Sequence, residues 1–375
     1  MYFTESLSMR LDDLLQRICA KLEITPTQYQ VAEERYRAVG SWLDAEGSRL
    51  HAFRPEIYPQ GSVLIATTVR PMGRDEYDVD LVCELQFDWR RLARPELLLD
   101  AVEARMKENE TYRSMIERRK RCVCLRYRGA FHLDILPACP DPASGPTCLV
   151  VPDRRLHTFV PSNPKGFAIW FEDRARALDM MLTKRLQPFP GQQPNELKPP
   201  LKRAVQLLKR WRDIYYAGID DLAPISIVLT TLAGSFYAGQ GTSAEALSGI
   251  LEGVVAALPR HGRLVVMNPS NSKEDLSERW GEKPHRYEAF VDGIIALRDE
   301  WLEVMGSARL SDVSTRLEKL FGEEITKAAV RGQVELIEKA RGDQVLATQR
   351  GLGTFGAATA PAFVPVRKNT FYGKE

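Results

Sequence analysis

Two aspartates at the start of an apolar segment are the side chains of this chain best placed for chemistry. Asp78 and Asp80 alternate with Val79 and Leu81. On a β-strand, residues two apart point to the same side, so the two carboxylates should lie close together. Carboxylates that close repel one another unless a cation lies between them, and oxygen ligands of this kind suit Mg²⁺. The pair therefore predicts a magnesium site at one end of a strand.

A third carboxylate lies inside a second apolar segment. Asp134 is flanked by Leu133 and Ile135, where an isolated charge is costly and needs a partner. If the two strands are neighbours, three carboxylates can hold two metal ions, one for an attacking hydroxyl and one for a triphosphate. His132 shares the face of Asp134 in this pattern, so it is predicted either to support that carboxylate or to be an ordinary packed or surface histidine.

Gly61 and Ser62 come just before a short helical stretch at residues 63–69. Backbone N–H groups at a helix N-terminus bind phosphate, a serine hydroxyl adds a donor, and glycine lets the backbone approach closely. An Asp-x-Asp pair alone is common at solvated strand ends. The combination with Gly61, Ser62 and Asp134 is far more specific and predicts a site for a nucleoside triphosphate.

The segments that carry these residues mix strand and helix patterns. Apolar spacing of three and four residues predicts helices over 8–22 and from Thr27, as the N-cap, to about Leu43. A further helix is expected over 95–109. Alternating segments bounded by Pro and Gly predict strands at 56–60, 78–87, 121–127 and 130–136, with a turn at Arg128–Gly129.

Helical patterns dominate the second half, after a proline-rich linker at 190–200. Helices are expected over residues 201–216, 224–238, 243–257, 286–304, 308–321 and 324–341. The sequence therefore predicts an α+β catalytic lobe with N-terminal helices (1–190), a helical lobe (191–342) and an irregular C-terminal tail (343–375). Ligand sites commonly lie in the cleft between two such lobes.

The pattern of Gly-Ser, Asp-x-Asp and a late Asp resembles the polymerase-beta-type nucleotidyltransferases. It is most similar to the bacterial relatives of cyclic GMP-AMP synthase and oligoadenylate synthase, the CD-NTases of CBASS anti-phage systems. The resemblance covers roughly residues 40 to 340 and includes four further segments: FVPSNPKGFAIWFEDRA (159–175), LKRAVQLLKRWRD (201–213), PISIVLTTLA (224–233) and VMNPSNSKEDLSERW (266–280).

The resemblance implies a polymerase-beta-type nucleotidyltransferase lobe with a mixed sheet and a C-terminal helical bundle lobe that binds nucleotide. Asp78 and Asp80 would hold two Mg²⁺ ions, with Mn²⁺ as a substitute, and Asp134 would hold the catalytic ion and help to deprotonate the attacking hydroxyl. The expected nucleotide-binding residues are Gln60, Gly61, Ser62, Lys209 and Ser226. The implied reaction joins ATP or GTP into a cyclic dinucleotide or trinucleotide messenger, which would activate a downstream effector.

Composition limits the other functions. The chain has 52 basic and 50 acidic residues, a balance that disfavours bulk capture of nucleic acid and mildly disfavours an RNA-tailing enzyme. Transfer to an RNA end, a protein or a small molecule is the alternative activity, and a catalytically silent scaffold is the alternative class. The sequence lacks a Cys/His zinc insertion of the kind that grips DNA in the animal synthase, so activation by duplex DNA is not expected.

The remaining signals concern location and partners. No apolar stretch reaches the ~18 residues of a membrane span and no signal-peptide pattern is present, which predicts a cytoplasmic protein. The C-terminal segment 363–375 is a candidate site for a regulatory or conjugating partner protein. Arg118–Arg121 is read as a solvated strand entry or a polyanion site, and GLGTFG (351–356) as tail rather than a dinucleotide site. Cys122 and Cys124 are read as buried small side chains rather than half a zinc site.

Overall fold

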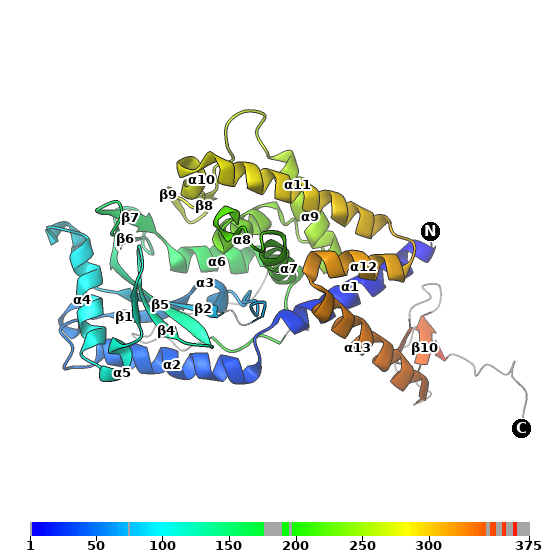
Figure 1. Cartoon of the computed structure of the whole chain (residues 1–375), viewed down its shortest axis with the longest axis horizontal. Helices are drawn as coiled ribbons and strands as arrows, with labels where there is room; N and C mark the ends of the chain where they lie inside the picture. Colours follow the sequence, from blue (N-terminus) through cyan, green and yellow to red (C-terminus); the bar gives the residue numbers. More distant parts are fainter. Residues whose placement is uncertain are drawn as a thin grey trace, which may run out of the picture.

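The fold was obtained as a computed structural model, which describes residues 2–73, 76–175, 190–194 and 197–342 and three short strands beyond them. Figure 1 shows two lobes, a mixed α/β lobe built on one sheet and a lobe made almost entirely of helices. This is the α+β arrangement predicted from the sequence, with a mixed sheet and a helical C-terminal region.

The α/β lobe contains strands that cross its centre and helices that cover them. Its elements are α2 (Pro26–Asp44), β1 (Glu56–Gln60), α3 (Gly61–Leu64), β2 (Tyr77–Glu84), α4 (Glu96–Lys107), α5 (Glu110–Arg113), β3 (Ile116–Arg118), β4 (Val123–Tyr127), β5 (Phe131–Pro140), β6 (Leu149–Asp153) and β7 (Thr158–Ser162).

The helical lobe contains the second half of the chain and one helix from its beginning. Its elements are α1 (Tyr2–Leu22), α6 (Pro164–Ala175), α7 (Pro200–Tyr215), α8 (Ser226–Phe236), α9 (Ser243–Ala256), β8 (Met267–Asn268), β9 (Asn271–Asp275), α10 (Glu278–Glu282), α11 (Pro284–Gly306), α12 (Leu310–Phe321) and α13 (Glu323–Gly342). The six helices expected after the linker all begin and end within two residues of their predicted bounds.

One parallel strand pair in an otherwise antiparallel sheet determines where the site forms. The strand order is β1-β2-β5-β4-β3, with β6 beside β5 and β7 beside β6. Only β2 and β5 run parallel among the described pairs of this sheet, and their register places Asp80 opposite Asp134. Because both strands run in the same direction, carboxylates at corresponding positions meet at one place in the sheet.

Two hydrophobic cores divide the chain differently from the predicted boundary at 190. Buried leucines of α1, such as Leu14 and Leu15, pack with α7 and α9, and Phe171 of α6 joins the same core. Helix α2 instead packs on the sheet through Tyr36 and Val39. The helix at the start of the chain was expected to accompany the catalytic lobe, but its apolar side chains from Leu11 to Leu22 are buried in the core of the helical lobe.

Three details correct the predicted elements. Helix α2 is capped by Thr25, not Thr27, in a capping box with Gln28, and Pro26 occupies the first helical position. The chain after residue 200 also contains the β8–β9 hairpin, which no helical pattern predicted. The expected irregular tail contains β10 (Leu346–Gln349), β11 (Phe355–Ala357) and β12 (Phe363–Pro365), which form a small antiparallel sheet.

Candidate active site

Register places the three aspartates on two adjacent strands. Asp80 pairs with Asp134 across the parallel β2–β5 ladder, and on its other side it pairs with Gln60, the last residue of β1. Asp78 is opposite His132. Strand alternation predicted a shared face for Asp78 and Asp80. Strand order adds a polar residue on each side of Asp80, Gln60 on β1 and Asp134 on β5.

Gly61 brings the first turn of α3 directly against Asp80. Its φ of +63° lies in the left-handed region, and a Cβ added there would lie 2.5 Å from Asp80 Oδ2. Only glycine combines this backbone conformation with this close approach at no steric cost. Ser62 follows in α3, and its hydroxyl accepts a hydrogen bond from the Thr68 hydroxyl at 3.3 Å. Helix α3 ends at Leu64, so the helical stretch expected over 63–69 is wrong beyond that residue, and the element meets the carboxylates through the close approach of Gly61 to Asp80.

A cavity of about 270 Å³ between the lobes collects most of the predicted site residues. Those that line it are Gly61, Ser62, Asp78 and Asp80 from the α/β lobe and Lys209 and Ser226 from the helical lobe. Gln60 and Asp134 are not in its lining and lie beside Asp80 in the sheet. Residues predicted to bind phosphate and residues predicted to bind metal therefore line one cavity, although they come from elements more than 100 residues apart in the chain.

The carboxylates of this cavity destabilise one another. Burial, followed by the charges of Asp78 and Asp134, raises the pKa of Asp80 to about 8. Desolvation and the Asp134 charge also raise the pKa of Asp78, although 68% of its side chain stays exposed and His132 opposes the effect. The protein alone therefore disfavours the ionised forms of Asp78 and Asp80, which is the situation that a divalent cation relieves.

The donor set suits a hard cation that arrives with its substrate. Asp134 Oδ1 is buried and has no hydrogen-bond partner among the described residues. In that same part of the chain no three His, Cys, Asp or Glu side chains already converge tightly enough to hold a metal. Mg²⁺ needs only one or two carboxylates and takes its other ligands from water and phosphates. An open, substrate-completed magnesium site fits both observations, whereas a closed zinc site at Cys122 and Cys124 does not.

Lys209 and Ser226 both have partners within the protein. Lys209 Nζ donates to the carbonyl oxygen of Thr67 at 2.9 Å and to its hydroxyl at 3.1 Å. Burial, aided by the nearby Arg212 charge, lowers the pKa of Lys209 to about 7. Ser226 Oγ accepts a hydrogen bond from Arg212, which also pairs with Asp213. Neither side chain points freely at an incoming phosphate in this state.

Arg212 and Asp213 are the lining residues that sequence reasoning missed. Both face the cavity from α7, and Arg212 bridges to the start of α8 through Ser226. They follow Lys209 by three and four residues, so they share its side of the helix. That spacing was the available signal, but charged residues at the end of a helix are more often solvated than functional.

The pKa of Lys209 predicts that nucleotide use weakens as pH rises. The charged form binds phosphate, and its fraction in the free protein falls as pH rises through about 7. We expect kcat/KM for the nucleotide to decline above this pH in wild type. In Lys209→Arg the guanidinium stays charged, so the decline should flatten. Steady-state kinetics across the pH range checks this, and equal slopes in both proteins would contradict it.

His132 supports Asp78 rather than Asp134. Its Nδ1 lies 3.6 Å from Asp78 Oδ1 and its Nε2 lies 2.7 Å from Glu76 Oε2. The predicted contact of this histidine with Asp134 is therefore wrong, because its imidazole lies beside Asp78 and Glu76 instead. Strand pairing decides this, because His132 is directly opposite Asp78 in the β2–β5 register.

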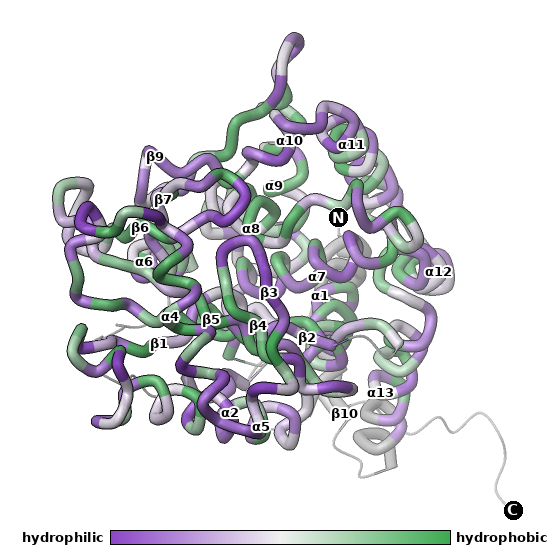
Figure 2. The backbone as a smooth tube through the Cα atoms, turned by 60° about the vertical axis from the view of Figure 1, so that its left-hand side comes forward, coloured by the Kyte–Doolittle hydropathy of each residue, from purple (hydrophilic) through white to green (hydrophobic). Residues whose placement is uncertain are grey.

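The basic run 118–121 is engaged in ion pairs. Figure 2 shows the hydrophilic loop between β3 and β4 that carries most of it. Arg121 Nε donates to Asp153 at 2.8 Å and its Nη2 donates to Glu278 at 2.7 Å, so it joins the sheet to α10 of the helical lobe. Lys120 contacts the same two carboxylates. These side chains stabilise the arrangement of the lobes instead of forming an open polyanion site.

Further observations concern the burial of Trp211 and the cysteines and the apolar character of the helices. Trp211 is 2% exposed and belongs to the core of the helical lobe. All six cysteines are free, and five of them are buried. Across the described residues, no helix has both the length and the apolar character needed to cross a bilayer.

Comparison with known proteins agrees with this geometry. Residues 9–175 match the Second Messenger Oligonucleotide or Dinucleotide Synthetase domain. A c-di-GMP synthase of Roseivirga ehrenbergii is 32% identical over 380 residues, which cover the whole of both chains. The cyclic dinucleotide synthase CdnG of Bradyrhizobium diazoefficiens is 29% identical, over 97% of this chain and 95% of that protein.

Solved structures give the same result. CdnG of Bradyrhizobium diazoefficiens in complex with GTP superposes with a TM-score of 0.70 at 27% identity, covering 87% of this chain and 99% of that one. CdnC of E. coli MS115-1 with ATP shares the fold, with a TM-score of 0.62 at 13% identity and coverage of 83% and 96%. With a relative 32% identical over its whole length, and with Asp78 and Asp80 lining one inter-lobe cavity next to Asp134 in the sheet, this chain belongs to the CD-NTases of CBASS type, a family of nucleotidyltransferases.

Proposed function

We propose that this protein is a cyclic dinucleotide synthase that uses GTP and produces cyclic di-GMP. The observation that carries the proposal is the convergence of Gly61, Ser62, Asp78, Asp80 and Lys209 on one cavity. The choice of GTP is supported by two relatives, one named as a c-di-GMP synthase and the other solved in complex with GTP.

In the proposed reaction, a ribose hydroxyl of one GTP attacks the α-phosphorus of a second. A new O–P bond forms, the bond to the β-phosphate oxygen breaks, and pyrophosphate leaves. Enzymes of this family generally use divalent metal ions, which lower the pKa of the attacking hydroxyl and neutralise charge on the triphosphate. Asp78 and Asp80 would hold two Mg²⁺ ions.

The chain's own groups have separate tasks in this reaction. Asp134 would take the proton of the attacking hydroxyl, and its buried Oδ1 has no hydrogen-bond partner among the described residues. The amides of α3 and the Ser62 hydroxyl would hold the β- and γ-phosphates. Gln60 ends the strand beside Asp80 and would support the same phosphates. A second round on the linear intermediate, turned over in the cavity, closes the ring.

Lys209 and Arg212 would exchange partners when nucleotide binds. A triphosphate offers these cations stronger acceptors than the Thr67 oxygens and the Ser226 hydroxyl. Arg212 would then release Ser226 Oγ, which becomes free to donate to a phosphate. The two lobes would thereby be linked through the nucleotide as well as through the protein.

Product analysis tests the proposal. The purified protein is incubated with Mg²⁺ and each radiolabelled nucleoside triphosphate alone, then with all four, and the products are treated with phosphatase. We expect a phosphatase-resistant product from GTP alone that comigrates with cyclic di-GMP. If a product forms only when ATP is also present, cyclic di-GMP is the wrong assignment and the product is a mixed cyclic dinucleotide or a larger ring.

The same assay separates the rival functions. Label transferred to RNA, to protein or to a small-molecule acceptor would support the alternative activity. No labelled product with Mg²⁺ or Mn²⁺ would support a silent scaffold.

We also propose that the product activates a downstream effector and that a regulatory or conjugating partner acts at the C-terminus, of which residues 366–375 lie outside the described chain.

A further inference from the structure

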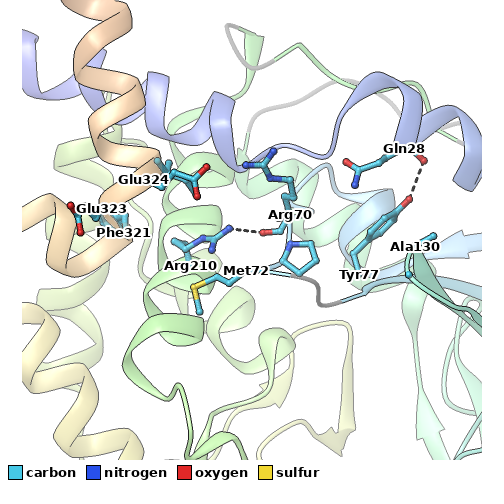
Figure 3. A pocket seen from close by; sticks show the side chains of 14 residues that line it. Gln28, Arg70, Met72, Tyr77, Ala130, Arg210, Phe321, Glu323 and Glu324 are labelled. Atoms are coloured by element: carbon cyan, nitrogen blue, oxygen red, sulfur yellow. Dashed lines mark hydrogen bonds between the residues drawn. The ribbon is translucent and has the colours of Figure 1, made fainter.

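A second and larger cavity lies beside the catalytic one. It measures about 680 Å³ and is lined by both lobes. Figure 3 shows Gln28, Tyr77 and Ala130 on its α/β side and Arg210, Phe321 and Glu324 on its helical side. Nothing in the proposed reaction uses these side chains.

Two arginines that line this cavity have no ion-pair partner among the residues that the structure describes. Arg210 is 2% exposed, its Nη2 donates to the carbonyl oxygen of Arg70, and its Nε has no hydrogen-bond partner among the described residues. In that part of the chain, neither Arg210 nor Arg70 has a carboxylate within ion-pairing distance. Burial and the nearby Arg70 charge lower the pKa of Arg210, and Asp213 offsets only part of this effect. A buried, unpaired guanidinium is costly unless an anion binds there.

The rest of the lining is largely apolar on both sides, and it includes two exposed acidic residues. Pro71, Met72, Tyr77, Phe321 and Ile325 supply the apolar surface. Glu323 and Glu324 are exposed at the first turn of α13, and Glu323 pairs with Lys327. An anionic group would therefore bind at the arginine end, and an apolar body would occupy the remainder.

The segment between the two cavities couples them. Pro71 and Tyr77 line both cavities, and Tyr77 directly precedes Asp78. Three side chains of α7 hold this segment by its carbonyl groups: Gln206 donates to Thr68, Lys209 to Thr67 and Arg210 to Arg70. A ligand bound at Arg210 would therefore act on the same segment, held by α7, that places Pro71 and Tyr77 in the lining of the catalytic cavity.

We propose that this cavity is a regulatory site for a small anion that carries an aromatic ring, with its phosphate or carboxylate group bound by Arg210 and Arg70. Bound ligand would join α7 and α13 to the 70–73 segment and fix Pro71 and Tyr77. A ligand bound in the Arg210 cavity would therefore change the reaction rate in the catalytic cavity.

Minimal probes test the binding claim without nucleotide turnover. Phenyl phosphate, benzoate and the neutral control phenol are titrated into the full-length protein by calorimetry. We expect saturable binding of one or both anions and none of phenol. Binding of phenyl phosphate alone would identify the ligand as a phosphate, and binding of benzoate alone would identify it as a carboxylate. Equal binding of phenol, or no saturable binding at millimolar probe, would overturn the proposal.

Variants locate the binding. Arg70→Gln should weaken it by at least about tenfold, and Arg70→Lys should restore most of it. Arg210→Met should abolish it, with thermal unfolding confirming the fold. Ser62→Ala is the matched control in the catalytic cavity and should leave probe binding unchanged. If Ser62→Ala weakens binding and Arg70→Gln does not, the anion occupies the catalytic cavity and the second site is excluded.

Pyrophosphate release in the presence of saturating probe tests regulation. We expect a saturable change of at least about twofold in wild type that disappears in Arg70→Gln. An unchanged rate at full occupancy would overturn the regulatory role. Because binding is measured by heat and not by product, failure of the proposed GTP activity would leave the binding result interpretable.

Discussion

Replacing Asp78 and Asp80 together with asparagine should reduce nucleotide incorporation by at least about 10³-fold while leaving the fold intact. Asparagine keeps the size of each side chain and removes the charge that would bind Mg²⁺. Pyrophosphate release measures the loss, and circular dichroism and thermal unfolding report on the fold. Activity within tenfold of wild type would show that these carboxylates do not hold the metals.

Stability should respond in the opposite direction from activity. The pKa of Asp80 is about 8 in the folded protein, against about 3.9 for an unfolded aspartate. The folded state therefore binds this proton more tightly, and stability falls as pH rises from about 4 to about 8. Asparagine does not titrate, so without Mg²⁺ the Asp80→Asn variant should melt at or above the wild-type temperature at pH 8. The difference should vanish below about pH 4.

Asp153 provides the contrasting carboxylate. It is fully buried, but it accepts hydrogen bonds from Arg121 and from the backbone amides of Arg155 and Leu156, and these partners hold its pKa below the usual range despite burial. Asp153→Asn should lower the free energy of unfolding by about 3 kcal/mol. The Asp153→Asn variant should keep its nucleotide incorporation activity at temperatures at which it remains folded. Loss of catalysis in Asp153→Asn alone would mean that lobe arrangement, rather than metal binding, limits the rate.

The contrast between these aspartates shows what the sequence could predict. Alternation along β2 placed Asp78 and Asp80 on one face, and the apolar flanks of Asp134 marked it as a buried charge. Their meeting also required β5 to lie parallel beside β2, which no local pattern specifies. We expected the two strands to be neighbours because metal chemistry needs such carboxylates to converge, and the register places Asp134 opposite Asp80; their role in holding metal stays a prediction.

Long-range contacts account for what the sequence left out. The spacing of Leu11, Leu14 and Ile18 predicted an amphipathic helix, but not that its apolar face packs with α7 and α9. Arg212 and Arg210 looked like ordinary charges on a helix, because burial of a charged side chain depends on which segments pack over it. Here the 67–70 segment packs over α7, and its carbonyl groups accept the hydrogen bonds of Lys209 and Arg210.

Substituting Gly61 by alanine should nearly abolish activity with a modest loss of stability. The added Cβ would lie 2.5 Å from Asp80 Oδ2, a distance that real Cβ atoms do not adopt. Either α3 moves away from the sheet or Asp80 rotates out of its position. Because a displacement of about 1 Å in an active site can cost about 10²-fold in rate, we expect kcat/KM for the nucleotide to fall by at least that factor.

A second glycine separates the two effects of the methyl group. Alanine at φ +63° carries a backbone strain of about 1 kcal/mol wherever it occurs. Gly218 has a φ of +84° and nothing within 4 Å of an added Cβ, so Gly218→Ala imposes similar strain with no contact. Both variants should lose comparable stability in denaturant unfolding, but only Gly61→Ala should lose activity. Equal losses of activity would attribute the effect to strain, whereas full activity in Gly61→Ala would show that Asp80 and α3 do not need their close approach for catalysis.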